Sequence, residues 1–202
     1  MTFYVNTCYN FENKNICSMS LQLFGGIVGL LIHIPLLIGI WRGTIKQSFA
    51  TYGLWCALDS ITAYSIYAQK GNFWLAFLYA VGAGITSLAL VLKKCFEWGK
   101  LESFVLFLVA GCVYIKYTSS EFYTMIFGVM ALTVASIPQI INTFKKPSES
   151  PTKIYIVFCL ANAFSLAGAK SFALEQIIYP GSALVLCLTI TILSARKNPQ
   201  PV

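Results

Sequence analysis

The chain has 202 residues, of which 57% are hydrophobic and 10% charged, and its mean hydropathy is +0.73. Soluble domains carry about 25% charged residues, so this composition excludes a water-facing globular protein and predicts an all-α integral membrane protein. The formal net charge of +7 would indicate nucleic-acid binding in a soluble protein; here we assign it to basic loops and expect no nucleic-acid partner.

Seven apolar stretches are long enough to cross a bilayer as helices, which takes about 20 residues each. In chain order they lie at 19–41, 49–69, 72–92, 101–117, 122–144, 153–170 and 174–194. We expect residues 1–18 to form an extracytoplasmic segment and 196–202 a cytoplasmic tail. We expect no cleavable signal peptide, because no basic region precedes the first span.

Basic residues separate onto alternate loops of this plan. Ten fall on one side, namely Arg42, Lys46, Lys93, Lys94, Lys100, Lys145, Lys146, Lys153, Arg196 and Lys197, and four on the other, namely Lys14, Lys70, Lys116 and Lys170. Because cytoplasmic loops carry the excess of Lys and Arg, the N-terminus is predicted outside and the C-terminus in the cytoplasm.

The first two spans recur after 103 residues. At this fixed offset Pro35 matches Pro138 and Asp59 matches Asn162, and six further pairs are identical: Phe24/Phe127, Gly25/Gly128, Ile34/Ile137, Ile38/Ile141, Tyr52/Tyr155 and Cys56/Cys159. An ungapped match over two helices and their loop indicates an internal duplication.

Asp59 carries the strongest functional signal, because it is the only aspartate and lies near the middle of its span. A carboxylate at that depth costs about 2.5–3.5 kcal/mol on insertion scales, so it is expected to face a cavity or a partner. Trp55 and Thr62 share its helix face. Phe158, Asn162 and Ser165 form the corresponding stripe in the second repeat. A structural hydrogen bond between helices is the alternative.

A polar side chain stands two residues before each proline, His33 in one repeat and Ser136 in the other. Proline removes a backbone hydrogen bond, so we expect Pro35 and Pro138 to act as hinges. His33, the only histidine, is either a packing residue or a cavity residue that could share a proton with Asp59.

Three helices, a linker helix and three more helices, with a proline hinge in each first helix, resemble the PQ-loop and SWEET transporters. Ser136-Ile137-Pro138-Gln139 resembles the family signature, whereas Leu36 stands where the first repeat would have glutamine. The resemblance implies two parallel three-helix bundles, at 19–94 and 121–195, joined by a linker helix at 95–120. In each bundle the third helix would lie between the first two.

The resemblance also implies that a small solute binds between the bundles and that Pro35, Pro138 and Gln139 belong to the hinges. The predicted substrate-binding residues are Asp59, Asn162, Trp55, Phe158, Thr62 and Ser165, and the predicted proton-coupling residues are Asp59 and His33. Equivalent positions in two parallel units meet at matching depths across one cavity, which favours the same site.

The predicted function is therefore transport of a small polar solute by alternating access, either proton-coupled or as an uncoupled facilitator. A receptor that binds a ligand without moving it, and a vitamin facilitator of the same plan, are the alternatives. An enzyme is not expected, because no catalytic motif is present. We expect no metal and no cofactor; Cys8 and Cys17 are either bridged or free. The predicted location is a bacterial inner membrane, with the lipid bilayer as partner and a homo-oligomer left open.

Overall fold

The computed structural model describes residues 19–44, 49–94, 100–145, 147 and 152–196, without the side chains of Leu101, Pro138 and Asn142. Within these ranges the regular secondary structure is entirely helical, which confirms the predicted all-α class. The segment 1–18, with Cys8 and Cys17, and residues 197–202 lie outside the described residues.

The helices agree closely with the apolar stretches of the sequence. They are the first span Met19–Trp41, whose second part is α2 (His33–Trp41), then α3 (Phe49–Ala68), α4 (Trp74–Leu92), α5 (Lys100–Thr118), α6 (Glu121–Ala135), α7 (Ile137–Lys145), α8 (Thr152–Ala167) and α9 (Leu174–Ser194). Only the end of α8 differs from the predicted boundary by more than two residues: the helix ends at Ala167, three residues before the predicted end. The chain turns there, where the Ala169 amide donates to the Leu166 carbonyl at 3.0 Å.

Two helices are interrupted just before a proline. In the first span, Ile32 separates the helical residues 19–31 from α2, and in the second repeat Ser136 separates α6 from α7. Proline cannot donate to the carbonyl one turn earlier, which weakens the helix at that point. Both breaks therefore follow from the duplicated prolines.

In the part of the chain that the structure describes, four helical segments are long and apolar enough to cross a membrane: Met19–Trp41, Trp74–Leu92, Glu121–Lys145 and Leu174–Ser194. These segments indicate a helical membrane protein. Helices α3 and α5 carry more polar residues and α8 is shorter, so their place as spans stays a prediction.

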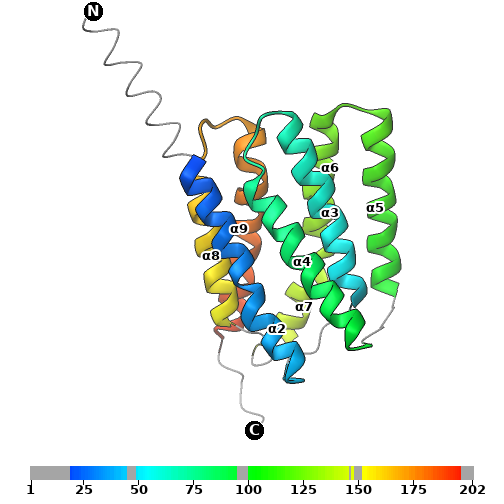
Figure 1. The fold of residues 1–202 in the computed structure, drawn as a ribbon, viewed down its shortest axis with the longest axis vertical. Helices are drawn as coiled ribbons and strands as arrows, with labels where there is room; N and C mark the ends of the chain where they lie inside the picture. Colours follow the sequence, from blue (N-terminus) through cyan, green and yellow to red (C-terminus); the bar gives the residue numbers. More distant parts are fainter. Residues whose placement is uncertain (1–18, 45–48, 95–99, 146, 148–151, 197–202) are drawn as a thin grey trace, which may run out of the picture.

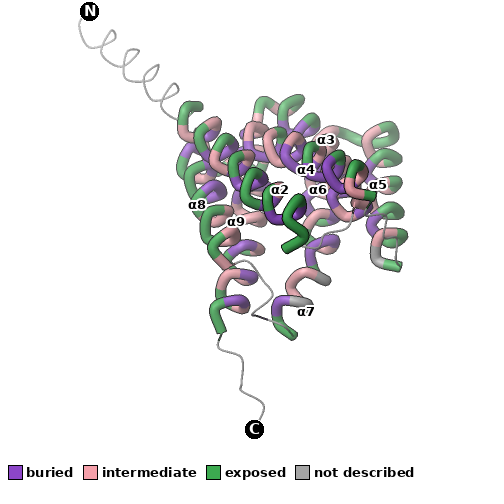
Figure 2. Tube along the Cα trace, turned by 60° about the horizontal axis from the view of Figure 1, so that its bottom comes forward, coloured by how far each residue is buried: buried purple, intermediate pink, exposed green. Residues whose placement is uncertain are grey.

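Polar and apolar side chains are distributed as a membrane interior requires. Large apolar residues face outward, with Leu88 61%, Phe107 72% and Val185 66% exposed, whereas the polar Thr62 and Ser165 are fully buried. Figure 2 shows the buried positions on the inward faces of the helices. Lipid can cover the outer residues, while the inner ones find partners within the bundle.

Each repeat places its third helix against its other two. Helix α4 contacts α2 and α3, and α9 contacts α6, α7 and α8. The two repeats meet where α3 packs against α6, and α5 lies against α3 and α6.

The bundle has two ends, seen at the top and bottom of Figure 1. The Lys70 end carries the connections between α3 and α4, between α5 and α6 and between α8 and α9. The Arg42 end carries the C-terminal ends of α2, α4, α7 and α9. Among the described basic residues, Lys70, Lys116 and Lys170 lie at the first end, and Arg42, Lys93, Lys94, Lys100, Lys145, Lys153 and Arg196 at the second.

Candidate functional site

A cavity of about 150 Å³ lies between the two repeats. A cavity needs roughly 10–15 Å³ of such volume to hold one water, so this one has room for on the order of ten waters. Its lining comes from both repeats and consists of His33, Tyr52, Trp55, Asp59, Tyr79, Ala83, Leu132, Thr133, Ser136, Gln139, Tyr155, Phe158, Tyr179, Ser182, Ala183, Leu186, Cys187 and Ile190.

The cavity occupies the part of the bundle toward the Arg42 end. On α3 and α8 its lining residues belong to the first half of each helix, from Tyr52 to Asp59 and from Tyr155 to Phe158. The half nearer the Lys70 end is filled instead by a hydrophobic cluster that includes Ile66, Leu75 and Met125, each fully buried. The cavity is thus separated from the Lys70 end by packed side chains.

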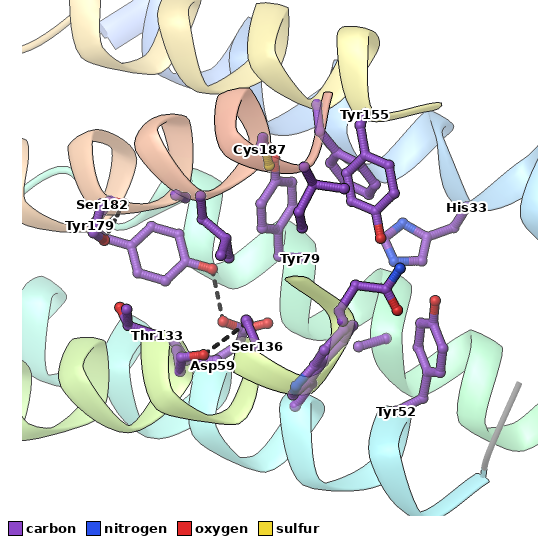
Figure 3. A pocket seen from close by; sticks show the side chains of 18 residues that line it. His33, Tyr52, Asp59, Tyr79, Thr133, Ser136, Tyr155, Tyr179, Ser182 and Cys187 are labelled. Carbon is purple, nitrogen blue, oxygen red and sulfur yellow. Dashed lines mark hydrogen bonds between the residues drawn. The ribbon is translucent and has the colours of Figure 1, made fainter. Parts of the chain in front are cut away.

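Asp59 faces this cavity from α3 and is 6% exposed. Its Oδ1 accepts a hydrogen bond from the Tyr179 hydroxyl of α9 at 2.7 Å (Figure 3). The bond crosses from the first repeat to the second, and it gives a buried carboxylate the partner that such a group needs.

Asn162, the counterpart of Asp59, makes the reciprocal connection. Its Nδ2 donates to the Tyr79 hydroxyl of α4 at 3.1 Å and to the Phe158 carbonyl of its own helix at 2.7 Å. The central polar residue of each repeat is therefore bonded to a tyrosine on the third helix of the other repeat. Such exchanged contacts are what a pseudo-two-fold relation between duplicated units produces.

His33 lies at the other end of the cavity from Asp59 in Figure 3. Its Nδ1 lies 3.2 Å from the Gly29 carbonyl, which can only accept, so Nδ1 carries a proton. The ring also contacts Phe158, with centroids 6.2 Å apart. Because His33 is bonded to Gly29 and Asp59 to Tyr179, the two predicted proton-sharing groups have different partners in this structure.

The structure gathers some predicted site residues around the cavity and places others behind it. Asp59, His33, Trp55, Phe158 and Gln139 line it. Asn162, Thr62 and Ser165 are fully buried outside the lining, because each packs into the contact between repeats. Thr62 lies against Gly128, Ser165 lies against Gly25, and Pro35 is exposed on the outer surface of α2.

Sequence reasoning missed the tyrosines that bond the two central polar residues. Tyr79 and Tyr179 lie 100 residues apart, three short of the offset that relates the first two spans of each repeat, so they do not align without a gap. The signal was the pair Tyr79-Ala80 and Tyr179-Pro180 at the start of each third helix. Only the folded bundle brings these hydroxyls to Asp59 and Asn162.

Hydrogen bonds between the repeats join them at the Lys70 end. We call the side chains of Gln22, Gln69, Asn72 and Gln176 the inter-repeat latch. Gln22 Nε2 donates to the Gly168 carbonyl at 2.6 Å and to Gln176 Oε1 at 3.3 Å, and Gln176 Nε2 donates to the Lys70 carbonyl at 3.2 Å. Asn72 Nδ2 donates to Ser165 Oγ at 3.0 Å, and Gln69 Nε2 to the Glu121 carbonyl at 3.2 Å.

Two matching contacts at the Arg42 end stay within one repeat each. Lys93 Nζ donates to the Trp41 carbonyl at 2.7 Å and lies 4.9 Å from the centre of that indole ring. Arg196 donates to the Phe144 carbonyl at 2.9 Å and lies 4.4 Å from that phenyl ring. Trp41 and Phe144 are 103 residues apart, and so are Lys93 and Arg196. The duplication therefore extends to the ends of the third helices.

Within the described ranges, no group of three or more His, Cys, Asp and Glu side chains is placed to hold a metal ion. Comparison with family models, with curated proteins and with solved structures found no match for this chain.

Proposed function

We propose that the protein is a seven-span transporter that moves a small polar solute across the membrane by alternating access. Three spans, a linker span and three spans form two parallel bundles in this proposal, and the Lys70 end faces outward. A bacterial inner membrane is the proposed location. The basic residues at the Arg42 end support this orientation, because they suit a cytoplasmic surface.

The observation that carries the proposal is a cavity between two duplicated halves, mostly apolar in its lining but with Asp59 and several hydroxyl groups, and closed off from one end. Lining residues come from both repeats. The described hydrogen bonds of the inter-repeat latch lie on the Lys70 side of the cavity. In alternating access, such a site is exposed to each side in turn as one repeat rocks against the other. With the Lys70 end outside, this structure corresponds to a state closed toward the outside.

Asp59 is the proposed coupling residue. It is the only carboxylate among the described residues that line the cavity, and its bond to Tyr179 ties its environment to the relative position of the repeats. A change in that position alters how well the carboxylate is stabilised, which is how proton binding can be linked to a conformational change. Uncoupled facilitation is the alternative outcome of the test below.

Flux in liposomes tests the proposal. A thermal-shift screen against sugars, amino acids, vitamins and amines first identifies a solute that raises the melting temperature, because specific binding stabilises the fold. Liposomes with the purified protein should then take up that solute faster than protein-free liposomes. Saturable binding without uptake would instead identify a receptor.

Cross-linking the latch tests alternating access directly. Gln22→Cys and Gln176→Cys, in a background without native cysteines, place thiols where side chains from the two repeats now meet. Oxidation should stop uptake and reduction should restore it, while solute binding persists in the locked protein. Uptake that continues in the fully cross-linked protein would contradict the proposed gating at this end. Each single-cysteine variant is the control.

A further inference from the structure

Three hydroxyl groups of the lining, two of them beside Asp59, present hydrogen-bond acceptors to the cavity. Thr133 Oγ1 donates to the Val129 carbonyl at 2.9 Å, Ser136 Oγ to the Leu132 carbonyl at 2.8 Å and Ser182 Oγ to the Tyr179 carbonyl at 3.0 Å. A hydroxyl has one proton and two lone pairs. Since each proton is directed to a carbonyl of the same chain segment, the lone pairs remain for a ligand.

Asp59 adds negative charge to the same region. Figure 3 shows Asp59, Thr133 and Ser136 together near Tyr179, away from His33 and Tyr52. The carboxylate accepts one hydrogen bond, from Tyr179, and a carboxylate can accept more than one. This end of the cavity therefore combines a carboxylate with hydroxyl oxygens that accept.

No described lysine or arginine lines the cavity to balance this charge. Lys93 and Arg196 are held at the Arg42 end on carbonyls and aromatic rings, and Lys116 pairs with Glu121 at the Lys70 end. The positive charge that balances Asp59 can therefore be supplied by a ligand or by a proton.

The amide groups that would suit a neutral sugar are directed elsewhere. Asn162 does not itself line the cavity, and its Nδ2 donates to the Tyr79 hydroxyl and to the Phe158 carbonyl. Gln139 Nε2 lies 3.4 Å from Thr143 Oγ1, which leaves its carbonyl oxygen as an acceptor. Asn162 therefore supplies no amide N–H to the cavity, and Gln139 adds a carbonyl oxygen that can accept.

We infer that the cavity takes a small protonated amine, with its three ammonium N–H groups donating to Asp59 and to the oxygens of Thr133 and Ser136. The aromatic rings of Trp55, Tyr79 and Phe158 enclose the remainder, which suits both a cation and its carbon chain. This inference names the substrate class of the proposed transporter and rests on that proposal for its role, but not for the binding itself.

Three probes that share a short alkyl chain separate charge from hydrogen bonding. n-Butylamine at neutral pH is a cation with three N–H donors, butyltrimethylammonium is a cation without donors, and 1-pentanol is neutral. Their binding to the purified wild-type protein is measured by thermal shift and by calorimetry. We expect n-butylammonium to bind at least about tenfold more tightly than either of the others, because it alone combines a positive charge with N–H donors and so forms charge-assisted hydrogen bonds.

Two outcomes would overturn the inference. Equal binding of 1-pentanol would show that charge is not recognised, and equal binding of butyltrimethylammonium would show that the acceptor oxygens are not used. Absence of selective binding together with saturable uptake of a neutral solute would reject the amine and leave the transporter standing. Selective amine binding without flux of any bound amine would support the amine site and reject the transporter.

A pair of threonines provides a matched control. Thr133→Val removes an acceptor from the lining, whereas Thr189→Val removes a hydroxyl that is bonded in the same way, to Val185, but does not line the cavity. Thr133→Val should weaken n-butylammonium binding several-fold and leave butyltrimethylammonium binding unchanged. Thr189→Val should change neither. Equal effects of the two substitutions on n-butylammonium would contradict the assignment.

Discussion

At the scale of single residues, the main polar contact in the cavity is the hydrogen bond between Asp59 and Tyr179. The carboxylate is 6% exposed and the tyrosine ring 4% exposed, and their oxygens are 2.7 Å apart. Removing the partner of a buried charge costs more than removing both members of a pair, because the charge is left in a poorly solvating interior. Asp59 and Tyr179 are therefore expected to respond differently to substitution.

Asp59→Asn keeps the shape of the side chain and an oxygen that can accept from Tyr179, but removes the carboxylate from the described lining. If Asp59 couples protons to solute, accumulation driven by a pH gradient should vanish while solute exchange, which needs no net proton transfer, should survive. Both activities are measured in liposomes with labelled solute.

Tyr179→Phe is the matched variant, since it removes the hydrogen bond and retains the carboxylate. It should keep pH-driven accumulation, at a reduced rate. A parallel loss of exchange and accumulation in Asp59→Asn would assign Asp59 to solute binding alone, and no change in either would make it a structural residue.

At the scale of helices, the two repeats exchange equivalent contacts. Gly25 of the first span meets Ala161 and Ser165 on α8, and Gly128 of α6 meets Thr62 on α3. Small residues allow helices to approach closely in membranes, where packing takes the place of the hydrophobic effect. The first helix of each repeat is thereby fixed against the second helix of the other.

Gly25→Ala should destabilise the protein by about 1–3 kcal/mol, a typical result of overpacking. An added Cβ would lie 2.6 Å from the Ala161 carbonyl oxygen and 2.8 Å from the Ser165 amide nitrogen, and backbone atoms cannot easily move away. The melting temperature in detergent measures the effect.

Gly181→Ala is the control for this substitution. Gly181 lies in α9 with no heavy atom within 4 Å of an added Cβ, so alanine should be neutral or slightly stabilising there. Gly128→Ala should have an intermediate effect, because the atom it meets belongs to the Thr62 side chain, which can rotate. Equal melting temperatures for Gly25→Ala and Gly181→Ala would refute the close contact.

The broken helices make a second prediction at this scale. Pro35→Ala and Pro138→Ala should allow a continuous helix across Ile32 and Ser136, leaving fold and binding near normal while slowing transport. Binding by thermal shift and uptake in liposomes are compared for each variant. Unchanged uptake in both variants would make the prolines packing features.

At the scale of the whole molecule, the two ends differ. Described hydrogen bonds of the inter-repeat latch join the repeats at the Lys70 end, while the Lys93–Trp41 and Arg196–Phe144 contacts at the Arg42 end each stay within one repeat. Opening at the Lys70 end must break the latch bonds and also separate the cluster of Ile66, Leu75 and Met125, to which both repeats contribute. This is the arrangement expected of two rigid units that rock about a shared site.

The predicted orientation can be tested at exposed residues of the two ends. Ser171→Cys at the Lys70 end and Gly43→Cys at the Arg42 end are introduced singly into a protein without native cysteines. A membrane-impermeant thiol reagent added to intact cells should label Ser171→Cys and not Gly43→Cys, which should react only after the cells are opened. The opposite pattern would invert the assignment.

Much of the fold follows from the sequence because it depends on local properties. Apolar length determines where helices form, the prolines determine where two of them break, and the 103-residue repeat indicates equivalent units. Asp59, His33, Trp55 and Phe158 are predicted as site residues for the same reason, whereas Gln139 is predicted as a hinge residue from the resemblance. Each is a polar or aromatic residue at an unusual position in an apolar span or a repeated motif.

The tertiary structure alone decided which polar residues reach the cavity. Asp59 and Asn162 are equivalent in sequence, yet one faces the cavity and the other is buried behind it, bonded to Tyr79. The direction of a side chain depends on how far each helix is rotated and shifted against its neighbours. Helix rotation is set by packing between residues far apart in the chain, and the sequence of one helix does not contain it.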